Sequence, residues 1–203
     1  MQFNGASMAR NLCAQCHYPS SHCVCKYVIA VENTITVWIL RHPHELSQAK
    51  STTPLLQLAL KRMNVCTGES PEDFLAVQSI LDQGVAVVYP SKQANAIEQL
   101  SEQRGTIKHI ILLDGTWSKV HRLWQLNPWL HALPSLTFAQ PPASEYRIRK
   151  ANRDDSLSTL EATNYCLAQL EGLSTQPLKQ LLAGFVQEQL KNMPAHVRQR
   201  YSS

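Results

Sequence analysis

The sequence has no apolar run long enough to cross a membrane. Its longest apolar runs, at residues 85–89 and 110–113, are strand-sized, whereas a membrane helix needs about 20 such residues. The opening residues 1–11 (MQFNGASMARN) also lack the apolar core of a signal peptide. We therefore expect a cytoplasmic protein without a membrane partner, in a reducing compartment where structural disulfides are rare.

Charge is scarce as well. Charged residues make up 17% of the 203 residues and hydrophobic residues 44%, which is the composition of a folded chain and not of a disordered one. The formal net charge of +4 at pH 7 permits an anionic partner but does not require one. The sequence contains no internal repeat or low-complexity tract, and nothing in it indicates an obligate protein partner.

Apolar segments alternate with helical ones along the chain. β-Branched and apolar runs predict strands at residues 34–40, 85–89, 109–113 and 136–138. Helices are predicted at residues 47–62, 71–83, 92–104, 117–125, 158–171 and 177–192. Pro54 should break or kink the first helix, and Ser70 with Pro71 should begin the second. These strands are mostly apolar throughout, so we expect an α/β fold with a mostly parallel sheet covered by helices on both faces.

Four of the six cysteines stand close together, in the pattern C-x-x-C, six residues, C-x-C; they are Cys13, Cys16, Cys23 and Cys25. Zinc prefers four such ligands in a tetrahedron. A redox dithiol is the alternative, but its C-x-x-C should follow a strand, and no strand is predicted before residue 13. The spacing therefore predicts a zinc knuckle over residues 1–30, followed by the main domain over residues 31–203.

An acid ends the apolar strand at residues 109–113, in the run IILLDGTW. Ligands of parallel α/β sheets bind at the carboxyl ends of strands, so Asp114 is a candidate site residue. Gly115 would let the backbone approach a ligand, and Thr116 could cap the following helix. Alternatively, Asp114 itself caps that helix and Trp117 fills the core.

Two further element ends could line the same pocket. Tyr89 and Pro90 follow the strand at residues 85–89, as Asp114 follows its own. The run Ser158-Thr159-Leu160-Glu161 fits a capping box. Free N–H groups at a helix start also attract a carboxylate or phosphate, so both a structural and a binding role stay open there.

A basic cluster next to Tyr146 precedes that helix; it consists of Arg147, Arg149, Lys150 and Arg153. Basic residues beside an aromatic ring suit RNA, through phosphate contacts and base stacking, although many such clusters are only solvated loops. His42, directly after the first strand, is a candidate site residue or a structural histidine.

Together these segments resemble the DTW-domain family, the tRNA-uridine aminocarboxypropyltransferases. The resemblance covers most of the chain, and its order and spacing are more specific than any single motif. The strongly charged segment 150–155 departs from the family pattern. The matching motifs are the cysteine pairs, His42-Pro43-x-Glu45, Ser51-Thr52-Thr53, Tyr89-Pro90, Asp114-x-Thr116-Trp117, Tyr146-Arg147-Ile148-Arg149 and Ser158-Thr159-Leu160-Glu161-Ala162.

The resemblance implies a SPOUT-like fold with a knot in the C-terminal half. It also implies transfer of the 3-amino-3-carboxypropyl group of S-adenosyl-L-methionine to N3 of a tRNA uridine, in the variable loop at position 47, with release of methylthioadenosine. Asp114 would then serve as counter-ion of the sulfonium or as base. Alternatives are an RNA methyltransferase of similar fold that uses the same cofactor, and a non-catalytic zinc-bearing RNA-binding module.

The implied roles fall into three groups. Catalytic roles are expected for Asp114, Thr116 and Trp117. Cofactor contacts are expected from Tyr89, Pro90, Leu113, Gly115, Trp117, Ser158 and Thr159. RNA contacts are expected from His42, Arg147, Arg149, Lys150 and Arg153.

Overall fold

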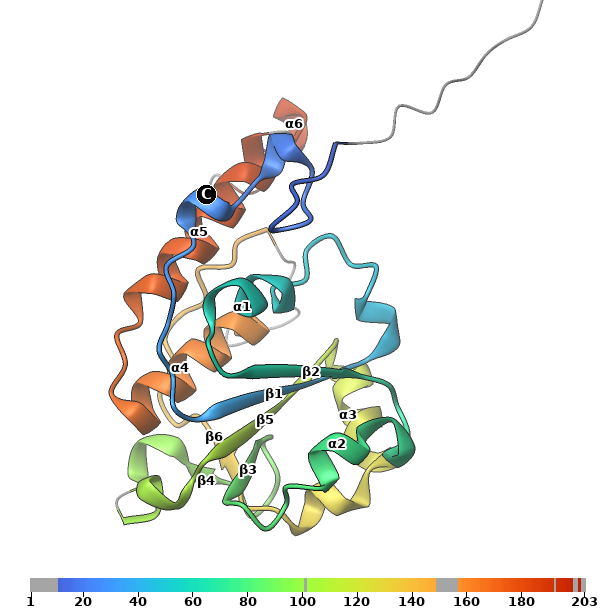
Figure 1. Cartoon of the computed structure of the whole chain (residues 1–203), viewed down its shortest axis with the longest axis vertical. Coiled ribbons are helices and arrows are strands. Elements are labelled where there is room, and N and C mark those ends of the chain that lie inside the picture. The colour runs from blue at the N-terminus through green and yellow to red at the C-terminus, as the bar shows by residue number, and fades with distance from the viewer. Residues whose placement is uncertain (1–10, 101, 149–156, 192, 199–200, 202–203) are drawn as a thin grey trace, which may run out of the picture.

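The centre of the molecule is a six-stranded sheet of order β2-β1-β5-β3-β6-β4, in which every pair of neighbours is parallel (Figure 1). The computed structural model describes residues 11–100, 102–148, 157–191, 193–198 and 201. The strands are β1 (Thr36–Arg41), β2 (Met63–Thr67), β3 (Val85–Val88), β4 (Asn95–Ala96), β5 (His109–Asp114) and β6 (Ser135–Thr137).

Helices cover both faces of this sheet, as predicted. One hydrophobic core lies under α1, α4 and α5, and a second lies under α2 and α3. Side chains of β1 and β5 alternate between the two cores, since successive residues of a strand point to opposite faces. The α-helices are α1 (Thr53–Ala59), α2 (Leu75–Gln78), α3 (Trp117–Leu126), α4 (Thr159–Glu171), α5 (Gln176–Lys191) and α6 (Ala195–Arg198).

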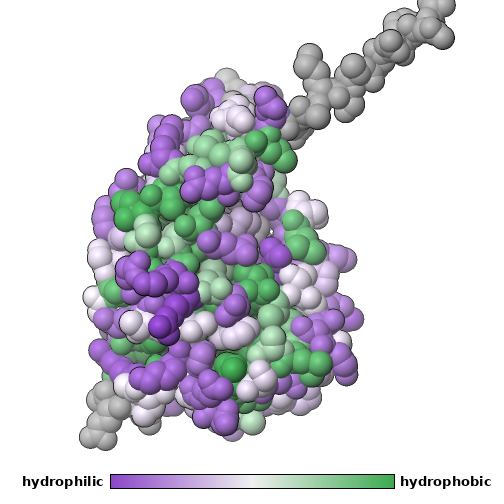
Figure 2. Space-filling view, viewed as in Figure 1, coloured by the Kyte–Doolittle hydropathy of each residue, from purple (hydrophilic) through white to green (hydrophobic). Residues whose placement is uncertain are grey.

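Short 3₁₀-helices connect many of these elements: η1 (Ser20–His22), η2 (Cys25–Tyr27), η3 (Pro43–Glu45), η4 (Pro71–Phe74), η5 (Ile97–Gln99), η6 (Glu102–Thr106) and η7 (Pro128–Ala132). None of the described helices is long and apolar enough to span a membrane. On the face drawn in Figure 2, hydrophobic residues are interspersed with hydrophilic ones.

Three predicted helices are wrong in extent. The helix predicted at residues 47–62 is helical only from Thr53 to Ala59, and Pro54 lies in its first turn, where a missing N–H costs nothing. The edge strand β2 begins directly after that prediction ends; it is only partly buried and lacks a strong apolar pattern. The segment at residues 92–104 contains β4 and 3₁₀ turns, because pairing with β6 outweighs helix propensity there. The helix at residues 71–83 is the 3₁₀-helix η4 followed by α2, which ends at Gln78.

The predicted helix ends around α4 are confirmed. Ser158 is the N-cap: its Oγ accepts the N–H of Glu161, and the Glu161 carboxylate accepts the N–H of Ser158. Gly172 ends the helix in the left-handed conformation, with φ of 68°, which glycine adopts without steric cost. The start of α4 is therefore rigidly placed beside the sheet.

Candidate functional site

Asp114 ends β5 at the centre of the sheet, paired in register with Arg41 at the end of β1. Only 6% of its surface is exposed. Thr53 Oγ1 donates a hydrogen bond to Oδ2 at 2.8 Å, and Thr159 Oγ1 donates one to Oδ1 at 2.6 Å. A buried carboxylate needs such partners, and here they come from the first residues of α1 and α4.

The starts of α1 and α4 are also bonded to each other. The N–H of Leu160 donates to Thr52 Oγ1 at 3.2 Å, and Ser158 Oγ takes the N–H of Glu161 at 3.3 Å. Ser158 is almost fully buried. Two N–H groups of the first turn of α4 are therefore already used within the protein, and Thr159 contacts Asp114. The cofactor contact expected from Ser158 and Thr159 stays a prediction.

The residues after Asp114 lead into α3. Thr116 is the N-cap of α3, but its hydroxyl makes no capping hydrogen bond and instead lies 3.3 Å from Ser118 Oγ. Asp114 does not cap α3 either, since its carboxylate bonds to threonines of two other helices. Trp117 is 52% exposed, so the alternative in which it fills the core is wrong.

Gly115 makes room for neighbouring side chains. A Cβ at this position would lie 3.0 Å from Cβ of Lys119 and 3.7 Å from Cβ of His42. Lys119 extends across this point to form an ion pair with Glu45 at 2.8 Å. The predicted close approach of a ligand to Gly115 would therefore have to share this space with the first turn of α3.

His42 is buried, and both of its ring nitrogens are engaged. Nδ1 accepts the N–H of His44 at 3.2 Å, so Nε2 carries the proton that faces Glu69 Oε1 at 2.5 Å. Glu69 also pairs with Arg122 of α3 at 3.1 Å. This arrangement joins the ends of β1 and β2 to α3, and it leaves His42 no ring nitrogen with which to contact RNA.

An aromatic wall follows β3, the neighbour of β5. The ring of Tyr89 stacks on Trp124 with centroids 4.1 Å apart and an angle of 8°, and Trp124 lies 4.4 Å from His131. The Tyr89 hydroxyl lies 3.3 Å from Nδ1 of His121. Because Val88 and Leu112 are in register, Tyr89-Pro90 lie beside Leu113-Asp114 at the carboxyl ends of β3 and β5. The pocket that they are expected to line together stays a prediction.

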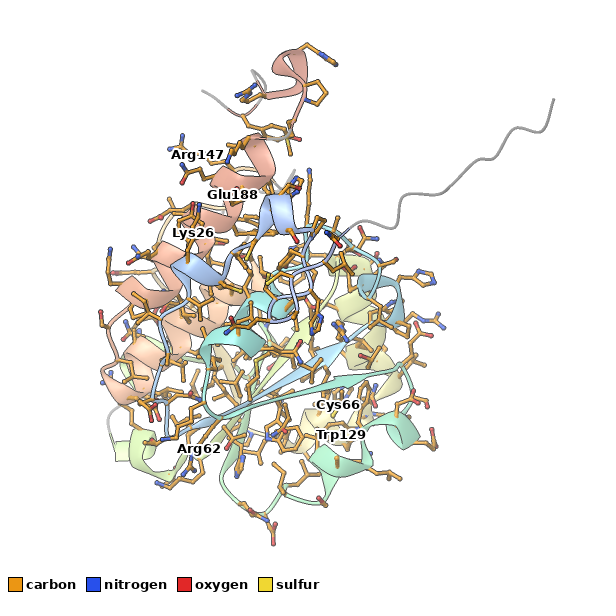
Figure 3. All side chains as sticks on the ribbon, turned by 45° about the horizontal axis from the view of Figure 1, so that its top comes forward. Lys26, Arg62, Cys66, Trp129, Arg147 and Glu188 are labelled. Atoms are coloured by element: carbon orange, nitrogen blue, oxygen red, sulfur yellow. The ribbon has the colours of Figure 1, made fainter. Side chains whose placement is uncertain are left out.

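The predicted RNA-binding segment is only partly described. Arg147 is exposed (Figure 3), whereas Arg149, Lys150 and Arg153 lie outside the described residues. Tyr146 is buried, its hydroxyl donates to the carbonyl of Lys50 at 2.6 Å, and its ring packs against Phe185. Tyr146 is thus a core residue and not the base-stacking residue that the sequence suggested.

The four clustered cysteines match a tetrahedral metal site. Their Sγ atoms all lie within 4.8 Å of one another, and the Cys13–Cys23, Cys13–Cys25 and Cys16–Cys23 distances are 3.6, 3.7 and 3.8 Å. A tetrahedron with Zn–S bonds of about 2.3 Å has edges of about 3.8 Å. The sulfur geometry therefore fits zinc.

Electrostatics in the cluster also favour a cation. Backbone N–H groups of Cys16 and Gln15 lower the pKa of the Cys13 thiol to about 6. Desolvation and the hydrogen bond to Cys13 raise the pKa of the Cys25 thiol to about 12. Several thiolates this close repel one another, so only a bound cation would allow all four to ionise.

The knuckle, defined as residues 11–28, packs on α5. The Tyr18 and Phe185 rings lie 5.5 Å apart. The Tyr27 ring covers Gly184 so closely that a Cβ there would lie 2.3 Å from the ring. Lys26 pairs with Glu188 at 2.9 Å (Figure 3). The boundary predicted at residue 30 thus separates two parts of the chain that share one core.

Thr53, Glu69 and Lys119 belong to the site, yet sequence reasoning gave none of them a role. Thr53 lies 61 residues from Asp114 in the chain, and no spacing rule connects such positions. The sole signal was the resemblance of the Ser51-Thr52-Thr53 stretch to the family motif.

Comparisons with known proteins agree with these motifs. The chain matches the DTW domain over residues 10–190. It is 30% identical over 181 residues to tRNA-uridine aminocarboxypropyltransferase 2 of Drosophila melanogaster, which covers 85% of this chain and 71% of that protein. The protein of the same name from Mus musculus is 29% identical over 167 residues, 78% of this chain and 56% of the relative. The chain thus spans little more than half of the mouse protein. No solved structure shows a significant match.

Proposed function

Since the chain belongs to the DTW-domain family, we propose that it modifies tRNA, as a transferase of the 3-amino-3-carboxypropyl group of S-adenosyl-L-methionine. The acceptor is N3 of a uridine in the variable loop, position 47, and methylthioadenosine is released. The observation that carries the proposal is the buried carboxylate of Asp114 at the carboxyl end of β5. It is the kind of group that favours the binding of a sulfonium cation, at the edge where parallel sheets bind ligands.

The proposed roles follow the geometry of the strand ends. The adenosine would lie against Tyr89, Pro90, Leu113, Gly115 and Trp117. The exposure of Trp117 is what a residue that contacts a ligand needs. The methionine carboxylate would approach Ser158 and Thr159, and Thr116 with Trp117 would hold the reacting carbon toward the uridine. Much of the rate gain would come from positioning, because the γ carbon and not the methyl group must face N3.

Groups outside the cofactor contacts would support the fold and bind the tRNA. Zinc on Cys13, Cys16, Cys23 and Cys25 would be structural and would hold the knuckle on α5. Arg147, together with Arg149, Lys150 and Arg153, would contact tRNA phosphates. His42 would hold Glu69 in place in the wall of the site and would not contact tRNA with its ring nitrogens. A knotted, SPOUT-like arrangement is consistent with the all-parallel sheet, and we propose a cytoplasmic location.

The activity is tested by product identification. Purified protein is incubated with an unmodified tRNA transcript and S-adenosyl-L-methionine, and the small-molecule product is identified by mass spectrometry. A matched transcript carries cytidine in place of the variable-loop uridine. We expect methylthioadenosine with the first transcript and none with the second. Release of S-adenosylhomocysteine would instead identify a methyltransferase, and tRNA binding without turnover would identify a binding module.

A further inference from the structure

Hydroxyl groups hold the Asp114 carboxylate from two sides. Thr53 donates to one oxygen at 2.8 Å and Thr159 to the other at 2.6 Å. The two threonines begin different helices, whose starts are joined by the hydrogen bond from Leu160 to Thr52. Because Thr53 is fully buried, its hydroxyl cannot exchange this partner for bulk water. The carboxylate therefore cannot turn without losing a hydrogen bond on one side.

A carboxylate at this place has two ways to assist the transfer. It can attract the sulfonium as a counter-ion, or it can accept the N3 proton of the uridine as a base. A base must come within about 2.6–3.2 Å of the atom that gives up the proton, but only 6% of Asp114 is exposed. A negative charge, by contrast, attracts a cation across several ångströms of weakly polar surroundings.

The threonines favour the first of these roles. The hydroxyl donors occupy one lone pair on each carboxylate oxygen and point their partial positive charge at it. The 13-residue helix α4 also begins at Thr159, so the positive end of its dipole lies beside the same charge. Both the hydroxyl groups and the start of α4 thus fix the position of the carboxylate, as a counter-ion needs.

We propose that Asp114 is a fixed counter-ion of the sulfonium and not the base of the reaction, and that Thr53 and Thr159 are positioning residues that hold its charge. This inference rests on the proposed function. In the transfer, the N3–Cγ bond forms as the Cγ–S bond breaks, and sulfur keeps the electron pair to become a neutral thioether. The N3 proton passes to solvent water.

The test measures how well the protein distinguishes two ligands of different charge. S-adenosyl-L-methionine carries a positive sulfur, and S-adenosylhomocysteine, which lacks only the methyl group on sulfur, has a neutral one. Titration calorimetry gives Kd for each, and their ratio reports the charge at the site. We expect the wild-type ratio to favour the cation, and Asp114→Asn to reduce that preference about tenfold.

The threonines are tested with matched variants. Thr53→Val and Thr159→Val keep the side-chain shape and remove the hydroxyl, while Thr53→Ser and Thr159→Ser keep the hydroxyl. We expect the valine variants to lose part of the preference for the cation and the serine variants to retain it. If Thr53→Val fails to fold because the site is fully buried, the pair at Thr159, which is only partly buried, decides the question.

The role of the Asp114 charge and the transfer activity can fail independently in these experiments. An unchanged Kd ratio in Asp114→Asn, together with loss of transfer, would make Asp114 the base and overturn the inference. Serine variants that behave like the valine variants would also overturn it, because shape and not the hydroxyl would then matter. A charge-dependent ratio in a wild-type protein that transfers nothing to tRNA would support the inference and contradict the proposed activity.

Discussion

Asp114 carries its charge where water barely reaches it. Leaving a carboxylate alone in such a place costs several kcal/mol, and its two threonine partners offset that cost. Removing either partner therefore leaves the carboxylate under-bonded, and removing the carboxylate altogether would leave two hydroxyls to find new acceptors.

Asp114→Asn should separate stability from activity. Asparagine keeps the shape of the side chain and can still bond to both threonines, so we expect Tm to fall by only a few degrees. The charge is lost, and transfer to tRNA in a single turnover should fall by about 100-fold or more. Circular dichroism and rapid-quench assays measure the two quantities. Transfer near the wild-type rate would make Asp114 a purely structural residue.

At this scale the sequence predicted residue types better than partners. Asp114 and the four cysteines could be found because an acid at a strand exit and a C-x-x-C pair are local patterns. Thr53 and Glu69 could not, since their contacts with Asp114 and His42 depend on which strands are neighbours. Trp117 was uncertain between the core and the surface, and only packing decides between them.

We expect the stability of the knuckle to depend on a bound metal. Its four thiols lie between residues 13 and 25, and Cys16 and Val24 are its buried apolar contribution to the core. Such a short segment has too little core of its own to remain folded without a cross-link or a metal. Loss of the metal should therefore lower the thermal stability of the protein.

We expect one zinc per chain in protein purified without added metal. Cys25→Ser should lose the zinc and lower Tm, whereas Cys66→Ser, outside the cluster, should keep it. Zinc should also dissociate as the pH falls, because protons compete for the thiolates. Elemental analysis and thermal unfolding measure both effects. Disulfides in place of zinc under reducing conditions would contradict the assignment.

Gly184 should behave unlike most helical glycines. Replacing glycine by alanine inside a helix normally stabilises by up to about 1 kcal/mol. Here the new methyl group would overlap the Tyr27 ring, so Gly184→Ala should destabilise by about 1–3 kcal/mol. Urea unfolding measures the change, and Gly105→Ala, where the added group meets open space, is the control.

A double variant checks the cause. Tyr27→Ala removes the ring, so Gly184→Ala should cost little in that background. An equal cost in both backgrounds would mean that Tyr27 is not what restricts residue 184.

For elements, the sequence predicted those with strong patterns. β1, β3, β5, α4 and α5 are apolar or clearly capped, and they lie near their predicted positions. β2 and β4 were missed because an edge strand and a two-residue strand have almost no pattern of their own. Pairing with β1 and β6 creates them.

The whole molecule has a small positive charge, so tRNA binding should depend on where that charge is gathered. If Arg147, Arg149, Lys150 and Arg153 contact phosphates, replacing all four by glutamine should weaken tRNA binding. The plot of log K against log salt should become shallower, by at most about 3–4 in slope. Filter binding across a salt series measures it. An unchanged slope would make the cluster a solvated loop.

For the whole molecule, the sequence predicted the fold class but not the order of the strands in the sheet. Apolar strands that alternate with helices predict a parallel sheet with two covered faces, whatever the order of strands. The order β2-β1-β5-β3-β6-β4 depends on how crossovers pack on each face, and that information is spread over contacts far apart in the chain.

The docking of the knuckle on α5 has a consequence for how the protein is made. Tyr27 and Glu188 are 161 residues apart, so at 5–20 residues per second a nascent chain waits roughly 10–30 s before its docking helix is synthesised. The four cysteines are complete long before then and need no other part of the chain to bind an ion. Metal capture would thus be the first folding event, and docking of the knuckle on α5 one of the last.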